Sequence, residues 1–376
     1  MSAADGGLSP VDHERLREAL ALAERSIGLS EPNPRVGCVL GDADGRVIGR
    51  GFTQQAGGPH AEVMALRDAA SAGVDVRGAT AWVTLEPCAH HGRTPPCADA
   101  LVAAGLARVV VAVGDPFPQV AGAGIARLRA AGIAVVVADG EIAQAARALN
   151  VGFFSRIERG RPWVRLKAAV SLDGRMALAD GRSQWITGPA AREDGHRWRR
   201  RAGAVLTGVG TVVADDPRLD VRLVPTQVQP MRVVLDPRAR TPAAARVLQP
   251  PGRVILACAE DAGGASGWPA GVETLRLPRD EHGLSLPALL EALAGLHVNE
   301  LHLEGGPRTN GAWLRQGLVD ELLLYVAPRL IGPGRPLAEL PPLARLDDAT
   351  AWQPVEPPRI VGHDLCWRLS RGCRDA

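Results

Sequence analysis

Several residue types and patterns are scarce in this chain of 376 residues, and each scarcity excludes a class of protein. No apolar run approaches the roughly 20 residues that a transmembrane helix requires. A formal net charge of +2 provides no strong electrostatic footprint for nucleic acid or a membrane surface. The six cysteines are scattered, and no charged and apolar leader precedes them, which argues against a secreted disulfide framework. We therefore expect a reduced, cytoplasmic protein that acts on small molecules.

Lysine is nearly absent as well, because Lys167 is the only lysine among 43 basic residues. The segment VRLKAAVSLDGRMA predicts a strand over 163–170, in which Lys167 lies on the face opposite Val164 and Leu166. Lys167 can therefore reach a cleft instead of the core. Lysine offers three rotatable donors and a pKa that shifts on burial, whereas arginine is planar and permanently charged. Retention of this lysine favours a functional role, and chance survival on an exposed strand is the alternative.

The length favours two domains, and the pattern of predicted elements restarts near 150–160. In the first half, a helix follows the cap residue Ser9, VGCVL and VIGRGF form a hairpin, and strands then alternate with helices. This alternation predicts a mostly parallel sheet with helices on both faces. The second half has further apolar strands, with helix signals at 188–202, 285–295 and 308–317. We place the domains at 1–152 and 153–376.

The strongest chemical signal is HAE at 60–62 followed by EPCAHHGRTPPC at 86–97. His60, Cys88 and Cys97 offer one imidazole and two thiolates, a ligand set that suits zinc. Three protein ligands leave a fourth position for water, as in catalytic zinc sites. Glu62 is poorly spaced to bind the metal but well placed to carry a proton from water to a leaving amine. One His, two Cys and a nearby Glu form the signature of zinc nucleobase deaminases.

Other interpretations of this cluster stay open. His90 or His91 would provide a fourth ligand and close the site into a structural zinc knuckle, which leaves Glu62 without a role. Alternatively, Cys88 and Cys97 are ordinary buried thiols. The insert AHHGRTPP separates the cysteines by eight residues, where the common deaminase signature has two. The longer spacing therefore restricts the match to those zinc deaminases that carry a long insert between the two cysteines.

The second half lacks a GxGxxG motif after a first strand, so the usual dinucleotide fingerprint is missing. GVG at 208–210 and EGG at 304–306 each follow an apolar strand, where glycines let backbone N–H groups approach a phosphate. A plain strand-to-turn glycine explains either motif equally well. HRWRRR at 196–201 suggests RNA binding through Trp198. A helix with solvated arginines, of which Arg199 holds a substrate phosphate, is the favoured interpretation.

Motifs from both halves resemble one family, the bifunctional deaminase-reductases of riboflavin biosynthesis: PNPRVGCVL, HAEVMAL, VTLEPCAHHGRTPPC, LKAAVSLDGRMA, SQWITG, GVGTVVADDPRLDVR and LEGGP. The resemblance covers nearly the whole chain in the family's order. It implies an α/β protein, in which a cytidine-deaminase-like three-layer α/β/α domain precedes a dihydrofolate-reductase-like α/β domain. It also implies two reactions. The first is zinc-dependent hydrolytic deamination of 2,5-diamino-6-ribosylamino-4(3H)-pyrimidinone 5′-phosphate. The second is NADPH-dependent reduction of the ribosyl group of 5-amino-6-(5-phosphoribosylamino)uracil to ribityl.

The resemblance also implies roles for individual residues. It places one zinc ion on His60, Cys88 and Cys97, proton transfer on Glu62, and a catalytic role in the reductase on Lys167. The implied substrate contacts are Asn33, His91, Arg93, Ser183, Arg199, Leu219, Arg222 and Glu304. The implied NADPH contacts are Ala169, Trp185, Thr211, Asp215, Gly306, Pro307, Arg308, Thr309, Asn310, Gly311 and Ala312. We expect a homo-oligomer, either a dimer or a tetramer, that binds phosphorylated pyrimidines and neither nucleic acid nor membrane.

Two rival hypotheses remain at this stage. One is a cytidine, deoxycytidylate or tRNA-adenosine deaminase with an appended regulatory domain, against which the eight-residue spacing argues. The other is a zinc-stabilised nucleotide-binding module without turnover. Substrate-dependent NADPH oxidation would exclude the first hypothesis, and ammonia release would exclude the second.

Overall fold

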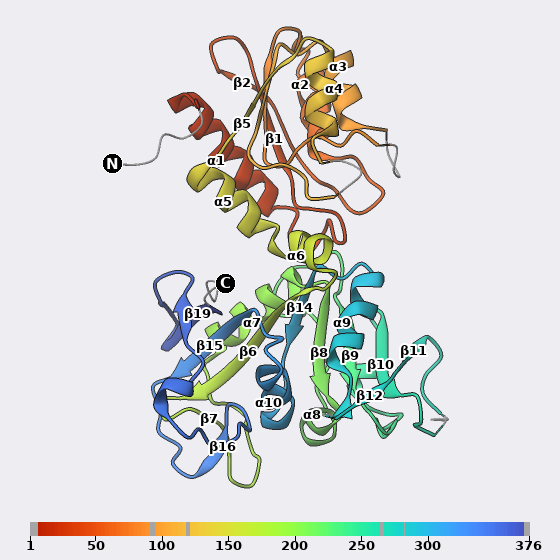
Figure 1. The fold of residues 1–376 in the computed structure, drawn as a ribbon, viewed down its shortest axis with the longest axis vertical. Coiled ribbons are helices and arrows are strands. Elements are labelled where there is room, and N and C mark those ends of the chain that lie inside the picture. The colour runs from red at the N-terminus through yellow and green to blue at the C-terminus, as the bar shows by residue number, and fades with distance from the viewer. Residues whose placement is uncertain (1–6, 91–94, 118–120, 264–266, 282, 372–376) are drawn as a thin grey trace. The chain divides into compact units, whose positions relative to one another are not determined.

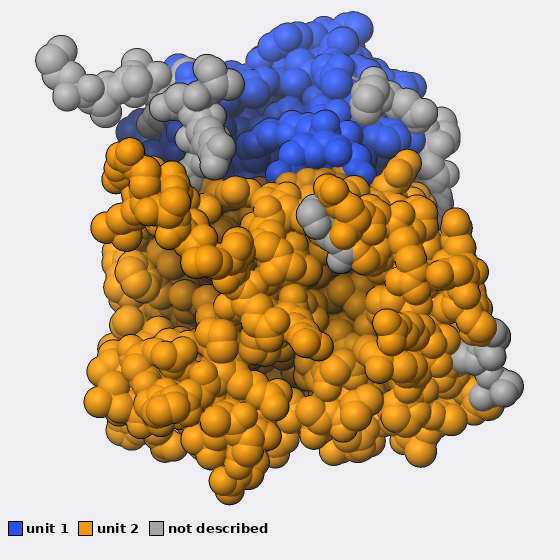
Figure 2. All heavy atoms as spheres, turned by 60° about the horizontal axis from the view of Figure 1, so that its bottom comes forward, with its two compact units in different colours: residues 1–160 blue, residues 161–376 orange. Residues whose placement is uncertain are grey.

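The computed structural model describes residues 7–90, 95–117, 121–263, 267–281 and 283–371. The chain divides into two compact units, Met1–Gly160 and Arg161–Ala376 (Figures 1 and 2). The boundary predicted at 152–153 lies inside helix α6 (Val151–Arg159), which belongs to the first unit because Phe153 and Phe154 are buried in that unit's core. No helix in the described ranges is both long enough and apolar enough to cross a membrane.

The first unit is a five-stranded sheet with helices on both faces. Its strands are β1 (Gly37–Gly41), β2 (Val47–Phe52), β3 (Thr80–Val83), β4 (Arg108–Val111) and β5 (Ala134–Val137), in the spatial order β2-β1-β3-β4-β5. Its other helices are α1 (Pro10–Glu24), α2 (Ala61–Ser71), α3 (Cys97–Ala103), α4 (Ala123–Ala130) and α5 (Gly140–Leu149). β1 runs antiparallel to both β2 and β3, so the sheet is mixed and not mostly parallel as predicted. The reason is that the chain reverses at the short turn between β1 and β2, and α2 then carries it across β1 to β3.

Two apolar cores lie on opposite faces of this sheet and confirm the predicted three layers. On one face, α1 and α5 cover the sheet through residues such as Leu16 and Ile142. On the other face, α2, α3 and α4 cover it through residues such as Ala65, Leu101 and Leu128 (Figure 1). The helices α5 and α6 were not predicted, although Ile142, Ala146 and Leu149 recur at helical spacing in α5 and α6 buries Phe153 and Phe154. The start of α2 carries His60 and Glu62, and the segment between β3 and α3 carries Cys88.

The first helix begins at its predicted cap. The Oγ atom of Ser9 accepts the backbone N–H of Asp12 at 3.2 Å, and the carboxylate of Asp12 accepts the backbone N–H of Ser9 at 2.9 Å. Asp12 is itself buried, and it accepts hydrogen bonds from Trp82 Nε1 at 2.7 Å and from both terminal nitrogens of Arg108 at 2.6 and 2.9 Å. One carboxylate therefore caps α1 and joins it to β3 and β4.

The second unit is built on a ten-stranded sheet. Along its main path the order is β11 (Val272–Leu277), β10 (Val254–Ala259), β9 (Met231–Leu235), β8 (Ala204–Gly208), β14 (Glu300–Leu303), β6 (Trp163–Ser171), β15 (Glu321–Ala327), β19 (Asp364–Arg371) and β17 (Trp352–Pro354). Strand β18 (Arg359–Val361) also pairs with β19. Two small ladders join β7 (Arg175–Leu178) to β16 (Gly334–Pro336), and β12 (Arg279–Asp280) to β13 (Gly283–Leu284). Strands β11 to β15 along this path are parallel, and the pairs made by β19 are antiparallel.

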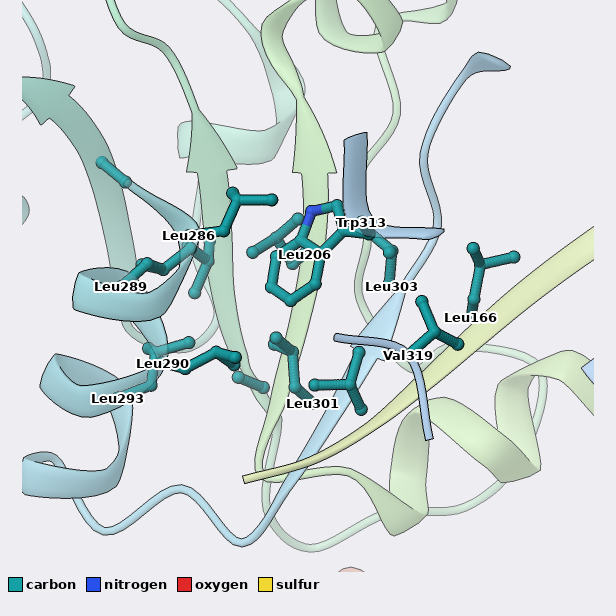
Figure 3. Close-up of a cluster of buried hydrophobic side chains, with 14 of the residues drawn as sticks. Leu166, Leu206, Leu286, Leu289, Leu290, Leu293, Leu301, Leu303, Trp313 and Val319 are labelled. Carbon is teal, nitrogen blue, oxygen red and sulfur yellow. The ribbon is translucent and has the colours of Figure 1, made fainter. Parts of the chain in front are cut away.

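Helices cover both faces of this sheet too. They are α7 (Pro189–Arg201), α8 (Val209–Asp215), α9 (Leu286–Gly295) and α10 (Pro307–Arg315), with short 3-10 turns at Arg246–Leu248 and Leu346–Asp348. One face packs against α9 and α10, where Leu289, Leu293 and Trp313 meet Leu206 and Leu301 of the strands (Figure 3). The opposite face carries α7 and α8. Three of these helices match the predicted ranges, whereas α8 was missed because its first two residues, Val209 and Gly210, were assigned to the preceding strand.

Candidate active sites

Three side chains of the first unit, His60, Cys88 and Cys97, place their ligand atoms within 4.8 Å of one another. Nδ1 of His60 lies 3.7 Å from Sγ of Cys88 and 3.3 Å from Sγ of Cys97. A tetrahedral zinc ion, with bonds of about 2.1 Å to nitrogen and about 2.3 Å to sulfur, would set these separations near ~3.6 Å. Both the donor set and the spacing therefore fit one zinc ion with three protein ligands.

Two helix beginnings position these ligands. His60 is the cap residue of α2, and Cys97 is the first residue of α3. The backbone N–H of Cys97 donates to Sγ of Cys88 at 3.3 Å, so the positive end of α3 acts on the Cys88 sulfur. The loop carrying Cys88 folds back over the start of α3, where the N–H of Ala98 donates to the carbonyl of Cys88 at 3.1 Å. Hydrogen bonds from Cys97 and His60 lower the pKa of the Cys88 thiol, which favours the thiolate that binds metal.

Glu62 lies in the first turn of α2, two residues after His60, and is only 3% exposed. Burial raises the pKa of its carboxyl to about 6, with His60 opposing the rise and Cys88 adding to it. A carboxyl with such a pKa exchanges protons readily near neutral pH. The geometry therefore places a proton carrier directly beside the metal ligands.

Glu86 organises the loop that carries Cys88, and sequence reasoning missed it. Its buried carboxylate accepts four backbone N–H groups, two from the loop between β4 and α4 and two from the first turn of α4. Oε2 accepts those of Asp115 at 3.3 Å and Gly122 at 3.1 Å, and Oε1 accepts those of Gly124 at 3.0 Å and Ile125 at 3.2 Å. The only signal in the sequence is the position of Glu86, two residues before the first cysteine of the motif.

Beyond the ligands and Glu62, the structure describes two further residues that the sequence analysis considered, His90 and Asn33. The ring of His90 lies 6.1 Å from the ring of Phe117, measured between centroids, and His90 does not join the ligand group within the described ranges. This favours the three-ligand interpretation. His91 and Arg93 lie outside the described residues. The backbone N–H of Asn33 donates to the carbonyl of Ser30 at 2.8 Å, which fixes the turn before β1.

The second unit contains a pocket of about 380 Å³ beside β6, α7 and α8. Every reductase residue predicted outside the turn at 306–312 lines this pocket: Lys167, Ala169, Ser183, Trp185, Arg199, Thr211, Asp215, Leu219, Arg222 and Glu304. These residues come from segments spread over most of the unit. Only the folded sheet brings them together.

Lys167, Arg199 and Glu304 form a half-buried charged group in this pocket. Arg199 donates to Glu304 through Nε at 2.5 Å and through Nη2 at 2.9 Å. Burial alone would raise the pKa of Glu304, but Arg199 outweighs it and holds the pKa well below its usual value. Burial lowers the pKa of Lys167, with Glu304 opposing this effect and Arg199 reinforcing it. Lys167 therefore loses its proton more readily than a solvent-exposed lysine does.

The two glycine motifs meet at the same end of the sheet. Gly208 ends β8 and caps α8, and Gly306 follows the neighbouring parallel strand β14 and caps α10. A Cβ atom on Gly208 would lie 2.5 Å from Oγ1 of Thr309, and one on Gly306 would lie 3.5 Å from Oγ1 of Thr211. Because free N–H groups at the start of a helix bind anions, this junction beside the pocket fits the diphosphate of a dinucleotide such as NADPH.

The later residues of that turn face another segment of the chain. Nδ2 of Asn310 donates to the carbonyl of Leu337 at 2.9 Å. A Cβ atom on Gly311 would lie 2.1 Å from the carbonyl oxygen of Glu339. Arg308 is largely exposed and lies 3.6 Å from the carboxylate of Glu339. These contacts give Arg308, Asn310 and Gly311 a partner within the protein, the segment 337–339.

Three cations that line the pocket were not predicted: Arg192, Arg218 and Arg246. Arg192 stacks over the ring of Trp185, with its guanidinium carbon 4.6 Å from the ring centroid, and donates to the carbonyl of Thr187 at 3.0 Å. The available signal was helical spacing, since Arg192 and Arg199 are two turns apart on one face of α7.

The basic motif HRWRRR lies inside the unit to a large extent. Trp198 is flanked by the guanidinium groups of Arg165 at 4.5 Å and Arg368 at 5.0 Å. Arg201 donates to Glu300 at 3.0 Å, and Arg199 is engaged by Glu304. The expectation of solvated arginines was therefore wrong for these two residues, because acidic side chains of β14 face this side of α7.

Comparisons with known proteins agree with these two sites. The family described as the cytidine and deoxycytidylate deaminase zinc-binding region matches residues 10–113. The family described as the RibD C-terminal domain matches residues 162–356. The second match identifies the second unit as a reductase, so the hypothesis of an appended regulatory domain was wrong.

Whole-chain relatives extend this agreement. The riboflavin biosynthesis protein RibD of Escherichia coli is 46% identical over 95% of this chain and 99% of its own length. The solved structure of Acinetobacter baumannii RibD covers 96% of this chain and 98% of its own, with 40% identity and a TM-score of 0.87. A deaminase-reductase structure from Thermotoga maritima covers 96% of this chain and 99% of its own, with 32% identity and a TM-score of 0.86. The chain therefore belongs to the RibD family of bifunctional zinc-dependent deaminases and NADPH-dependent reductases of riboflavin biosynthesis.

Proposed function

We propose that the two units catalyse consecutive reactions on one phosphorylated pyrimidine. The Thermotoga maritima relative is described as a diaminohydroxyphosphoribosylaminopyrimidine deaminase and 5-amino-6-(5-phosphoribosylamino)uracil reductase. We assign the deamination to the first unit of this chain and the reduction of ribosyl to ribityl to the second. The observation that carries the proposal is the buried Glu62 beside a three-ligand zinc group, on the same chain as a pocket lined by a half-buried lysine.

In the deaminase, His60, Cys88 and Cys97 hold the metal. Zinc bound there supplies the Lewis acidity that makes water nucleophilic at neutral pH. Glu62 accepts a proton from the attacking water and delivers it to the ring nitrogen and then to the departing amine. Asn33, His91 and Arg93 orient the pyrimidine. The helix start at Cys97 keeps Cys88 ionised through its backbone N–H.

In the reductase, the pocket orients the opened ribose against the cofactor. NADPH supplies the hydride. Lys167, as the ammonium, donates hydrogen bonds to the substrate, and the Arg199–Glu304 pair fixes the charge around it. Ser183, Leu219 and Arg222 complete the substrate side of the pocket. Ala169, Trp185, Thr211 and Asp215 contact the cofactor, together with the turn from Gly306 to Ala312.

We also propose that the chain assembles into a homo-oligomer, a dimer or a tetramer, through the second unit. Support comes from apolar side chains that the unit leaves largely exposed, among them Leu330, Leu346 and Ile360. Sedimentation velocity measures this directly. The thiolate ligands require a reducing compartment, which favours the cytoplasm.

One coupled assay tests the assignment of both sites. Purified protein receives zinc, NADPH and the diaminopyrimidinone substrate, and ammonia and NADPH are followed separately. Glu62→Gln should abolish ammonia release and leave NADPH oxidation on the deaminated substrate intact. Lys167→Arg should impair only NADPH oxidation. Loss of both activities in the first variant, or near-normal turnover in the second, would contradict the proposal.

A further inference from the structure

The single lysine of the chain lies against its single tyrosine. Lys167 on β6 and Tyr325 on β15 belong to adjacent parallel strands. Nζ of Lys167 lies 5.7 Å from the centroid of the Tyr325 ring. This distance is within the range in which the negative face of an aromatic ring attracts a cation. The buried ring therefore offers an attractive surface to the ammonium of Lys167, which lines the pocket.

The Tyr325 ring is itself held in place. Its side chain is fully buried, and its hydroxyl donates to Oδ2 of Asp194 on α7 at 2.6 Å. The same Oδ2 accepts a hydrogen bond from Nη2 of Arg359 on β18 at 2.6 Å. Burial and the neighbouring Asp194 carboxylate raise the pKa of Tyr325 far above its usual value, so the side chain stays a neutral phenol. Tyr325 therefore acts on Lys167 through its ring face and not as a phenolate.

The titratable neighbours of Lys167 either have other partners or are neutral. Glu304, directly after β14, attracts the Lys167 ammonium but is already engaged by Arg199 of α7, which repels the ammonium. Arg165, the preceding residue on the same face of β6, is neutralised by Glu300 and Glu321. His302 of β14 lies buried near this group, and burial lowers its pKa, so it is neutral at pH 7. The stem of Lys167 also passes close to α7, since a Cβ atom added to Gly195 would lie 3.9 Å from Cε of Lys167. Tyr325 of β15 adds a rigid contact at the ammonium end of the side chain.

We propose that Tyr325 is a positioning residue of the reductase, whose ring face, locked by Asp194, holds the Lys167 ammonium toward the bound substrate. The inference rests on the proposed role of Lys167. It adds the contacts that hold Lys167 in place. They run from Arg359 on β18 to Asp194 on α7, then to Tyr325 on β15 and to Lys167 on β6.

A chain with one lysine permits a direct test. Protein labelled with ¹³C at the lysine ε-carbon has one such resonance, and its titration reports the ionisation of Lys167 in the full-length protein. In Tyr325→Leu the ring is lost, so the midpoint should fall by about one pH unit. In Tyr325→Phe the ring remains, and the midpoint should match the unchanged protein. The control is Leu322→Ala, which removes a buried side chain of the same strand that points into the opposite core.

Reductase kinetics provide the second readout. Tyr325→Leu should lower kcat about tenfold, with a smaller change in KM, and should move the alkaline limb of the kcat profile to lower pH. Tyr325→Phe should lose only a few-fold in kcat, because the ring is kept but its anchor to Asp194 is removed. Ammonia release by the first unit should be unchanged in both variants.

Each outcome decides the proposal. Equal titration midpoints in Tyr325→Leu and the unchanged protein, or equal shifts in the Phe and Leu variants, would overturn it. A shift in Leu322→Ala as large as that in Tyr325→Leu would reduce the effect to general loosening of β15. If Tyr325→Leu does not fold, Asp194→Ala tests the anchor, and an unchanged kcat would overturn the locking role. Near-normal turnover of Lys167→Arg would instead remove the proposed function of Lys167, so the two failures are distinguishable.

Discussion

Arg199 and Glu304 are joined by two parallel hydrogen bonds, Nε to Oε1 at 2.5 Å and Nη2 to Oε2 at 2.9 Å, in the wall of the reductase pocket. Both residues were expected to contact substrate, and in the structure they also bind each other. Such a bidentate pair fixes both side chains, so the charges of the pocket are in place before substrate binds. The pair is mostly removed from solvent, so breaking it exposes one unpaired buried charge.

Glu304→Gln should therefore cost stability as well as activity. We expect the free energy of unfolding of the second unit to fall by about 3 kcal/mol, because Arg199 loses its counter-charge in a buried site. Urea denaturation measures the loss, and NADPH oxidation should fall with it. The matched control is Glu273→Gln, whose partner Arg253 is largely exposed and whose loss should cost less than about 1 kcal/mol. Equal costs in the two variants would contradict this account of the pair.

Alanine substitution at two glycines of the second unit should have different effects, one on stability and the other on NADPH binding. Gly311→Ala would place a Cβ atom 2.1 Å from the carbonyl of Glu339, so we expect a loss of roughly 2 kcal/mol or more in unfolding free energy. Gly210 is exposed at the start of α8, and a Cβ atom added to it would meet nothing within 4 Å. Gly210→Ala should keep full stability and raise the KM for NADPH if the backbone there approaches the cofactor. Thermal unfolding and NADPH saturation curves separate the two effects.

Removal of zinc should abolish the deaminase activity of the first unit and leave the reductase activity of the second unit unchanged. A chelator, or the variant Cys97→Ser, should reduce bound zinc from about one ion per chain to near zero and abolish ammonia release. NADPH oxidation on the deaminated substrate should persist, because the reductase pocket lies wholly in the second unit. Cys258→Ala serves as the control, since this buried thiol lies in the core of the second unit. Zinc loss from that variant would show that the metal is held elsewhere.

The stability contributed by Asp12 should depend on pH. Burial alone would raise the pKa of Asp12, but hydrogen bonds from Arg108, Trp82 and Ser9 outweigh it and hold the pKa well below the usual 3.8. A depressed carboxyl pKa stabilises the folded state above the unfolded-state value, and this contribution is lost as pH falls toward the folded-state value. The stability difference between the unchanged protein and Asp12→Asn should therefore be largest at neutral pH and shrink below about pH 4. Urea denaturation of both proteins at matched pH tests this, and a constant difference would contradict it.

Local patterns predicted a large part of this protein. The cap at Ser9, the helices at 61–71, 189–201 and 286–295, and the zinc ligand set all follow from residues close together in sequence, whose effects do not depend on distant contacts. The missed elements were α5, α6, α8, the short strands β7, β12, β13 and β16 to β18, and the longer strand β19. Most of the missed strands are only two to four residues long, and tertiary contacts decide their conformation.

Residue chemistry and spacing alone determined that this chain carries a zinc-binding set with a proton carrier, and they favoured a functional role for its single lysine. Only the tertiary structure decided which groups meet. Sγ of Cys88 accepts the first N–H of α3, and the carboxylate of Glu86 accepts N–H groups from a segment far away in sequence. Lys167 lies against the ring of Tyr325. Lys167 and Tyr325 are far apart along the chain, and the parallel pairing of β6 with β15 brings them together. Such pairing depends on the burial of whole sheet faces, a long-range effect that no local pattern contains.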